Sequence, residues 1–437
     1  MSQTGQSGEA DQSAGAALTA EIGFDPGDAQ SALAELPQAP VVFALYGAGA
    51  HAEPYVGRTP NLRARLERLL QPSEKHPRRL QLAGLVRRIA WRLTGSEFES
   101  LLTQFELLNS LYGPKALERM HLRHPAFVRF LGGNPYPRVT VTYRPGWREA
   151  DWAYGPFPSR AAAERFVDEA LKLFLLRRCT FELEPDPEFP GCVYSEMKMC
   201  LAPCFKGCTD ERYAEEADAV QRFLATRGES RLAALRGERD QASTNLEFER
   251  AGELHAQVQR VEAVRALAAE LVRPLSRLRA AILQASAHPD EVAVFLFEGG
   301  RLRGPAGFST LGMRIQNEQS GSSSLYAQPM AMEPVAETES TGQGTGVRDQ
   351  TVARPARGVL EARMEEALTA LAGNRVAPSA TERQGHLALL KRWYYRPEAR
   401  RAGEIFFPDA EGRWPVKAML RGAGRVAAKM LGEAKGG

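Results

Sequence analysis

The chain has 437 residues, of which 43% are hydrophobic and 25% are charged, the composition of a globular protein long enough for two or three domains. Its formal net charge of +3 is nearly neutral, so total charge does not by itself indicate a nucleic-acid-binding protein. No apolar run approaches the roughly 18 residues of a membrane-spanning helix, and the N-terminus lacks the pattern of a signal peptide. We therefore expect a cytoplasmic protein that is not embedded in a membrane.

Residues 1–38 are rich in Gly, Ser, Ala, Gln and Asp, a composition that predicts a disordered tail. A compact α/β segment is expected to follow at residues 39–130. Between Arg58 and Arg92 there are ten Lys or Arg residues and only two Glu, so this segment is locally basic and compatible with DNA binding. An arginine-rich helix face in contact with solvent would give the same pattern.

Residues 55–65 (YVGRTPNLRAR) place a phenol, a glycine and three guanidinium groups where a strand is expected to turn into a helix. The preceding residues are apolar, as in a strand, and the following leucines recur at helical spacing. Gly57 would let a backbone or a phosphate approach closely. Arg58 and Arg65 could face one pocket, and guanidinium groups beside the phenol of Tyr55 suit a phosphodiester. From these residues alone, a surface helix with solvated arginines is the alternative.

This run resembles the second half of the GIY-YIG nuclease motif, in the form found in the UvrC family of bacterial excinuclease components. The resemblance implies that Tyr55 helps to deprotonate the attacking water. It also implies catalytic roles for Arg58, which stands where the family usually has lysine, and for Arg65. The residues that we expect to contact DNA are Gly57, Asn61 and Arg63.

Other parts of the nuclease site are incomplete. The first triplet of the motif falls on residues 41–43, where Phe43 keeps the ring of the family's tyrosine but lacks its hydroxyl. The family's metal-binding glutamate falls on Gln104, whose neutral amide is a much weaker ligand for Mg²⁺ or Mn²⁺ than a carboxylate. Glu99 and Glu106 would project from other sides of the same helix. We therefore expect a strong loss of any metal-dependent cleavage rate.

All five cysteines lie within thirty residues, spaced C-x12-C-x7-C-x3-C-x3-C, in a region that we assign to residues 131–210. Clustered thiols in a protein without an export signal favour a soft metal or an iron–sulfur cluster over disulfides, and zinc is the physical competitor. The segment resembles the cysteine segment of UvrC, which implies a 4Fe–4S cluster with a structural role. The implied ligands are Cys179, Cys192, Cys200 and Cys204, whereas Cys208 is an additional cysteine.

A charged helical region is expected at residues 211–271. Within it, residues 245–264 (NLEFERAGELHAQVQRVEAV) are expected to continue a helix that begins near Arg231, with a bend at Gly252. Helical hairpins are common, so a plain antiparallel helix pair would account for this pattern.

The same residues resemble the UVR motif, through which UvrC and UvrB, the second component of the excinuclease, recognise each other. The resemblance implies that Phe248 is the aromatic anchor of a small helical interface. Leu246 and Leu254 are expected to contact the partner beside it.

The last region is expected to be a partial α/β unit formed by residues 275–316 and 356–437. The intervening residues 317–355 are rich in Ser, Gly, Thr, Gln and Glu, which predicts a disordered insertion. Residues 291–308 predict two strands joined by a turn and resemble the segment before the second nuclease domain of UvrC. We expect the RNase H-like and helix-hairpin-helix domains of that family to be absent.

These patterns predict a multidomain α/β protein that resembles a shortened UvrC. The resemblance implies a nucleotide excision repair protein that binds damaged double-stranded DNA and the excinuclease component UvrB, with a possible metal-dependent incision on the 3′ side of a lesion. The first alternative is a catalytically impaired repair adaptor that keeps the scaffold and the hairpin. The second is an unrelated zinc-binding helical protein.

Overall fold

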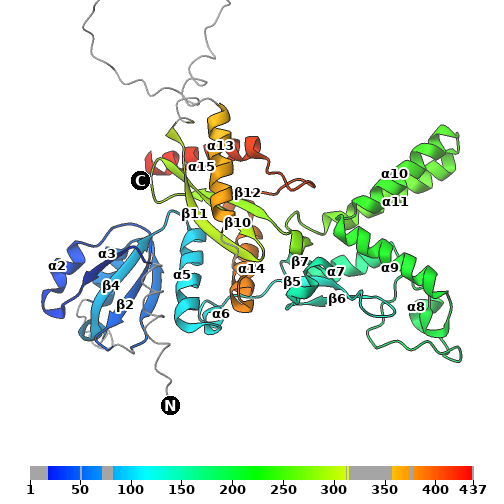
Figure 1. Cartoon of the computed structure of the whole chain (residues 1–437), viewed down its shortest axis with the longest axis horizontal. Coiled ribbons are helices and arrows are strands. Elements are labelled where there is room, and N and C mark those ends of the chain that lie inside the picture. The colour runs from blue at the N-terminus through cyan, green and yellow to red at the C-terminus, as the bar shows by residue number, and fades with distance from the viewer. Residues whose placement is uncertain are drawn as a thin grey trace, which may run out of the picture.

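The computed structural model describes residues 18–49, 52–70, 82–311, 313, 357–373 and 377–435. Three sheets of four antiparallel strands, each accompanied by helices, form three units along the described chain (Figure 1). The prediction of a multidomain α/β protein is therefore confirmed. None of the helices in these residues combines the length and the apolar character needed to cross a membrane.

The N-terminal unit is a sheet of order β1-β4-β2-β3 with two helices packed on one face. Its strands are β1 (Ala20–Gly23), β4 (Val86–Leu93), β2 (Val41–Gly47) and β3 (Tyr55–Thr59). Its two helices are α2 (Ala29–Ala34) and α3 (Leu62–Leu70). Leu62 and Leu66 lie on the inner side of α3 and are fully buried against Phe43 and its neighbours, so the leucine spacing read from the sequence corresponds to the packed side of this helix.

The prediction that residues 1–38 form a disordered tail is wrong for residues 18–38. β1 pairs with β4 along its whole length, and Phe24, Leu33 and Leu36 are buried in the N-terminal unit. These few apolar side chains are enough to attach an edge strand and a short helix, although the average composition of the segment is that of a flexible chain. Residues 1–17 lie outside the described part of the chain.

Helix α5 (Glu97–Tyr112) joins the N-terminal unit to the C-terminal unit. Ser96 caps the helix by accepting a hydrogen bond from the backbone N–H of Glu99, at 3.1 Å. One side of α5 packs Leu107 against the first sheet, while the other side packs Phe98 and Phe105 into the core of the C-terminal unit. Because it serves two cores, α5 is apolar on two sides rather than on one.

The middle unit has a sheet of order β6-β5-β7-β8, with helices α7 and α9 packed against it. The strands are β5 (Ala126–Phe130), β6 (Val139–Thr142), β7 (Ala153–Phe157) and β8 (Arg273–Pro274). The helices are α6 (Lys115–Arg119), which leads into the unit, α7 (Arg160–Leu171), α8 (Val193–Glu196) and α9 (Asp210–Ala225). The expected domain boundary at residue 130 is wrong, because β5 is a central strand of this sheet.

Helices α10 (Glu229–Thr244) and α11 (Phe248–Ala266) form an antiparallel hairpin that projects from the middle unit (Figure 1). The expectation of one helix running through residue 245 is therefore wrong. Leu246 adopts a left-handed conformation with φ 62°, and the N–H of Glu247 bonds back to the carbonyl of Ala242 at 2.9 Å, which ends α10 as in a Schellman motif. Gly252 lies inside α11 and marks no bend.

The C-terminal unit is a sheet of order β11-β10-β9-β12 between two layers of helices. The strands are β9 (Ala280–Ala285), β10 (Glu291–Glu298), β11 (Arg301–Ser309) and β12 (Glu404–Phe406). The helices are α13 (Arg357–Ala372), α14 (Ala380–Tyr394) and α15 (Val416–Lys435). The predicted strand pair is confirmed, since Glu298 of β10 pairs with Arg301 of β11. The predicted insertion at residues 317–355 lies outside the described residues.

Strand alternation explains these layers, because successive side chains of a strand point to opposite faces of the sheet. In β10, Val294 and Leu296 pack against α13 and α15, whereas Phe295 and Phe297 pack toward α14 and α5. Helix α5 therefore contributes to the core that contains Phe295 and Phe297. Because α5 also packs on the first sheet, the N-terminal and C-terminal units are held together by side-chain packing as well as by the chain.

Candidate functional sites

Tyr55 and Gly57 lie on one side of β3, beside Phe43 of β2. Tyr55 is exposed, and its ring centroid lies 6.1 Å from that of Phe43. Gly57 pairs with Phe43 in the sheet, and a Cβ at residue 57 would come within 2.8 Å of the Phe43 ring. The buried Phe43 ring thus requires a glycine at position 57 and supports the ring of Tyr55. Position 43, where the resemblance to the nuclease motif implies a tyrosine, is part of the core here.

Arg58 lies on the other side of β3, toward α5. Its guanidinium is 3.4 Å from Oε1 of Glu97, and Glu97 also accepts two hydrogen bonds from Arg396, at 2.7 and 2.8 Å. The hydrogen bond from Arg396, together with the charges of both arginines, lowers the pKa of Glu97 to about 2. Arg58, which the resemblance implies to be catalytic, is therefore part of an ion-pair network between the N-terminal unit and the C-terminal region. No sequence signal pointed to Glu97 or Arg396.

The polar residues at the start of α3 have different surroundings. The Oδ1 atom of Asn61 accepts a hydrogen bond from a backbone N–H of the first turn, at 2.9 Å, and so caps the helix. Arg63 donates hydrogen bonds to the carbonyls of Leu36 and Ala34, at 3.0 and 2.5 Å. Arg65 is exposed, and within the described part of the chain its guanidinium makes no hydrogen bond or ion pair. Asn61 and Arg63 therefore have structural roles, whereas Arg65 is available to bind an anion.

Gln104 lies half-buried on α5, two helical turns after Glu97 and on the same side of the helix. No hydrogen bond in the described residues connects it to the predicted catalytic side chains. The carboxylate of Glu99 accepts a hydrogen bond from the N–H of Gly95 at 2.9 Å, and burial raises its pKa. Burial also raises the pKa of Glu106 to about 7. The carboxylate that shares the side of Gln104 is Glu97, which is already bound by two arginines.

In the cysteine segment, three other thiols are near enough to Cys200 for their charges to act on it. Burial raises the pKa of Cys200 to about 11, and the neighbouring thiols of Cys179, Cys204 and Cys192 raise it as well. Cys208 is absent from this set and has only Cys204 as a neighbouring thiol. The thiols that influence Cys200 are therefore the other three that the sequence assigned to a cluster, and the assignment itself stays a prediction.

Hydrogen-bond donors point at these sulfur atoms. The backbone N–H of Ala202 donates to Sγ of Cys200 at 3.3 Å, and a guanidinium N–H of Arg177 donates to Sγ of Cys179 at 3.7 Å. Ala202 also has a left-handed conformation with φ 58°, which is uncommon for a residue with a side chain. Donors of this kind stabilise metal-bound thiolates, so the donor chemistry fits a soft metal or an iron–sulfur cluster.

The distances between these thiols do not yet correspond to a metal site. Among the described residues, no three Cys, His, Asp or Glu side chains are arranged so that they could hold a metal ion. All five cysteines are free thiols. Binding of a metal or a cluster would therefore have to bring the thiols closer together.

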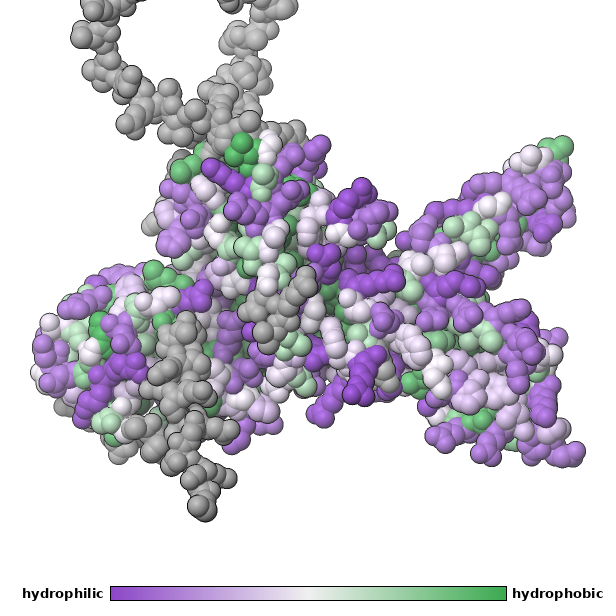
Figure 2. All heavy atoms as spheres, viewed as in Figure 1, coloured by the Kyte–Doolittle hydropathy of each residue, from purple (hydrophilic) through white to green (hydrophobic). Residues whose placement is uncertain are grey.

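The tip of the α10–α11 hairpin exposes two large apolar side chains. Leu246 is 71% exposed and Phe248 is 69% exposed, where α10 ends and α11 begins. Figure 2 shows an apolar end on a mostly hydrophilic projection. Leu254 is buried between the two helices. This corrects the expectation that Leu254 contacts a partner, because a buried side chain stabilises the hairpin from within. Leu246 and Phe248 are the two predicted interface residues that are accessible.

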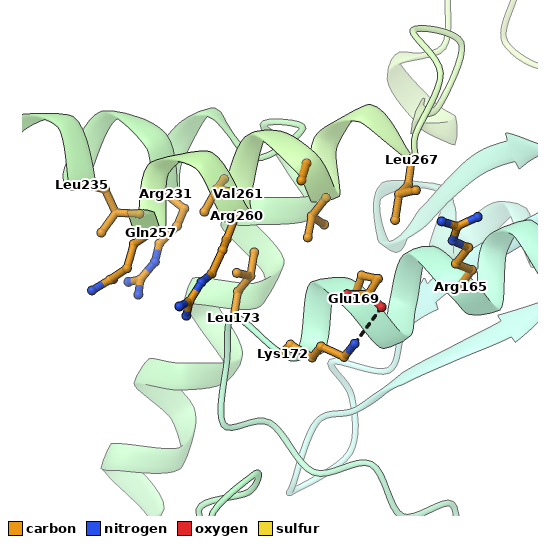
Figure 3. Close-up of a pocket in the computed structure, with 12 residues that line it drawn as sticks. Arg165, Glu169, Lys172, Leu173, Arg231, Leu235, Gln257, Arg260, Val261 and Leu267 are labelled. Atoms are coloured by element: carbon orange, nitrogen blue, oxygen red, sulfur yellow. Dashed lines mark hydrogen bonds and ion pairs between the residues drawn. The ribbon is translucent and has the colours of Figure 1, made fainter. Parts of the chain in front are cut away.

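A groove of about 610 Å³ lies between the base of the hairpin and α7. Its floor is aliphatic, and Arg231, Gln257 and Arg260 extend from the hairpin to the same side of it, while Lys172 and Glu169 form an ion pair on the opposite wall (Figure 3). No local pattern in the sequence predicts this groove, because its walls come from segments about 60 to 100 residues apart in the chain. It is separate from the apolar tip.

Comparison with known proteins identifies the relatives of this chain. Residues 128–223 match the family model described as the middle domain of the UvrC/Cho excinuclease. The UvrABC system protein C of Leptospira biflexa is 29% identical over 270 residues, which cover 61% of this chain and 43% of that protein. The corresponding protein of Haemophilus influenzae is 30% identical over 240 residues, 54% of this chain and 38% of the relative. No solved structure matches significantly.

The matched part of the chain spans less than half the length of these relatives. The matched middle domain coincides with β5 to β7, the cysteine segment and most of α9. It therefore includes the four cysteines that the sequence assigned to a cluster, and it ends before the hairpin. Over about half of its length the chain is thus similar to UvrC proteins, and residues 128–223 match the model of their middle domain.

Proposed function

We propose that the protein is a cytoplasmic nucleotide excision repair factor of the UvrC type that binds DNA and docks on UvrB. The relatives are named as components of the UvrABC system, which supports the repair role. The observation that carries the docking proposal is the exposure of Leu246 and Phe248 at the tip of the hairpin. Exposed apolar side chains at the end of a rigid projection are typical of an interaction surface.

The hairpin is built to present this tip in one orientation. Leu254, Val258 and Val261 are buried along its inner side. Ion pairs join its two helices farther toward the base, where Arg236 bonds to Glu262 at 2.8 Å. Because the two helices are fixed against each other, little conformational entropy would be lost when Phe248 enters a pocket on the partner.

Pull-down of UvrB by the full-length chain tests this proposal. We expect Phe248→Ala to lose most of the binding, since buried aromatic anchors commonly contribute 2 kcal/mol or more, about a 30-fold change in affinity. Phe181→Ala, which removes another exposed aromatic ring, is the matched control and should bind as the unchanged protein does. Equal binding by the Phe248→Ala protein would contradict the proposal.

The geometry favours an adaptor role over cleavage. Arg58 forms an ion pair with Glu97. Among the described residues of α5, Glu97 is the carboxylate on the same side of the helix as Gln104, and it already binds two arginines. A divalent metal such as Mg²⁺ or Mn²⁺ would therefore lack the anionic ligand that it prefers. We propose that the protein retains the scaffold and the docking hairpin, and that any hydrolysis of phosphodiesters is slow.

Incision on the 3′ side of a lesion is the second candidate, because Tyr55 and Arg65 remain exposed beside the sheet. Incubation with UvrA, UvrB, Mg²⁺ and a lesion-containing duplex separates the two roles. A 3′-side nick that disappears in Tyr55→Phe would establish the nuclease. Binding to the complex without a nick is the result expected for the adaptor.

We further propose that Cys179, Cys192, Cys200 and Cys204 hold a 4Fe–4S cluster. When bound, the cluster would cross-link a segment that has few strands or helices of its own, and the N–H donors of Ala202 and Arg177 would stabilise its thiolates. Zinc is the alternative for a four-thiolate site. Anaerobically purified protein should be brown and contain iron, and Cys200→Ser should lose both features while Cys208→Ser keeps them. Colourless protein with stoichiometric zinc would overturn the assignment.

A further inference from the structure

A second, smaller pocket of about 190 Å³ lies where the middle unit meets α14. One wall comes from His124 and Phe127 at the start of β5, and another from Tyr143 and Trp147 in the loop after β6. Arg383 and Gln384 on α14 complete it. The pocket is thus built by segments that are about 260 residues apart in the chain. It is far in sequence from the predicted nuclease motif, the cysteines and the hairpin tip.

Two aromatic rings stand open to solvent at this pocket. Tyr143 is 43% exposed and Trp147 is 37% exposed. The guanidinium of Arg383 lies 4.4 Å from the centroid of the Trp147 ring. Gly300 has φ 81°, and a Cβ there would come within 3.2 Å of Trp147 and 2.5 Å of Arg383. The Arg383 guanidinium therefore lies against the Trp147 ring, and Gly300 leaves room for both side chains.

The charges around the pocket are positive. Arg144 and Arg148 are exposed beside the two aromatic residues, and neither has an ion pair within the described part of the chain. Burial lowers the pKa of His124, and the positive charges of Arg144 and Lys391 lower it further. None of the described residues that line the pocket is acidic. An anionic ligand would therefore be attracted to this surface, and no acidic side chain among the described lining residues would repel it.

We infer that this pocket receives an unstacked base of single-stranded nucleic acid. Tyr143 and Trp147 would stack on the base, and Arg144 and Arg148 would bind the flanking phosphates, as aromatic and basic side chains do in single-strand-binding proteins. The amide of Gln384, which has no hydrogen-bond partner in the described residues, would face the polar edge of the base. The inference rests on the proposed function and deepens it, because repair proteins act on strands that have been separated at a lesion.

Fluorescence anisotropy of a labelled oligothymidylate bound to the full-length chain tests this inference. Stacking of one base on one aromatic side chain is worth about 1–3 kcal/mol, so Tyr143→Ala and Trp147→Ala should each weaken binding by about five-fold or more. Tyr143→Phe keeps the ring and should bind normally. Phe181→Ala, which removes an exposed ring elsewhere, should also have no effect.

A blunt duplex of the same length serves as the second ligand. We expect the two alanine variants to bind it as the unchanged protein does, because paired bases cannot enter the pocket. Unchanged affinity of both variants for the single strand, or an equal loss for single strand and duplex, would overturn the inference. Should Trp147→Ala fold poorly in a thermal melt, the comparison of Tyr143→Ala with Tyr143→Phe decides the question, since Tyr143 is a surface residue. UvrB is absent from this assay, so its result is independent of the docking test.

Discussion

At the scale of single residues, the nuclease-like motif is partly explained by packing. Gly57 is required by the buried ring of Phe43, Asn61 caps α3, and Arg63 binds the end of α2. Residues that the sequence assigned to DNA binding therefore have structural roles that would persist in a protein without nuclease activity. Arg65 has no such role in the described contacts, so it remains the arginine of the motif that is free to meet a phosphate.

Replacement of Gly57 tests this view at one residue. A Cβ at this position would meet the Phe43 ring at 2.8 Å, and Phe43 is itself buried and unable to move freely. We expect Gly57→Ala to lower the free energy of unfolding by about 1–3 kcal/mol, measured by chemical denaturation. Gly84→Ala is the control, because no atom lies within 4 Å of its added Cβ. A Gly57→Ala protein as stable as the control would contradict the packing argument.

At the scale of elements, α5 determines how the N-terminal and C-terminal units are joined. Its two apolar sides pack into separate cores. Glu97 links Arg58 to Arg396 at one end of the helix. Glu106 lies farther along it, close enough to Arg92 and Arg301 for their charges to act on it and also near Glu382. Helix α5 thus carries two polar connections in addition to its packing.

The raised pKa of Glu106 predicts a pH dependence of stability. Burial raises the pKa to about 7 from an ordinary value of 4.5, against the opposing effect of Arg92 and Arg301. Between these two values the folded state binds more protons at Glu106 than the unfolded state does. The contribution of Glu106 to the free energy of unfolding is therefore fully present below about pH 4.5 and is lost as pH rises through 7. We expect Glu106→Gln to remove this loss and to stabilise the protein by about 1–3 kcal/mol at pH 8.

Denaturation curves collected from pH 5 to pH 8 measure this effect. Glu253→Gln changes an exposed carboxylate on α11 and provides the control, which should follow the unchanged protein at every pH. If Glu106→Gln and the unchanged protein lose stability in parallel as pH rises, another group is responsible for the dependence.

At the scale of the whole molecule, three units meet through α5, α14 and β8. The N-terminal unit and the C-terminal unit share α5, and β8 brings the chain back to the middle sheet before the C-terminal unit begins. The α10–α11 hairpin projects away from these contacts (Figure 1). In this arrangement the apolar tip is accessible at the end of the projection, while the rest of the molecule is a connected body.

The contact between α5 and α14 depends on Gly385. A Cβ at this residue would lie 1.9 Å from the ring of Phe105, which is fully buried. We expect Gly385→Ala to separate the two helices, to lower the free energy of unfolding by about 3 kcal/mol and to make the chain between the units more sensitive to proteases. Limited proteolysis followed by mass spectrometry measures the second effect.

Gly358→Ala provides the matched control for this change, because Gly358 lies in α13 with no atom within 4 Å of an added Cβ. Alanine is a better helix former than glycine, so this variant should be as stable as the unchanged protein or slightly more stable. A Gly385→Ala protein that resists proteolysis equally well would show that the contact does not hold the units together.

The sequence by itself determined features that depend on local patterns. Leucine spacing indicated α3, and the alternation at residues 291–308 indicated β10 and β11. The assignment of four cysteines to a cluster stays a prediction. The family relationship also followed from the order of short motifs and agrees with the matched middle domain. These features are readable because hydrophobic periodicity and ligand spacing act over a few residues.

Only the tertiary structure decided which side chains are free to act. It bound Arg58 to Glu97, buried Leu254 and exposed Phe248. In the structure, residues 20–23 form an edge strand although the composition of residues 1–38 is that of a disordered tail. The pocket that contains Tyr143 and Trp147 also depends on the tertiary structure, because the loop after β6 and helix α14 line it together. Such outcomes depend on contacts between residues far apart in the chain, whose burial and charge no local pattern specifies.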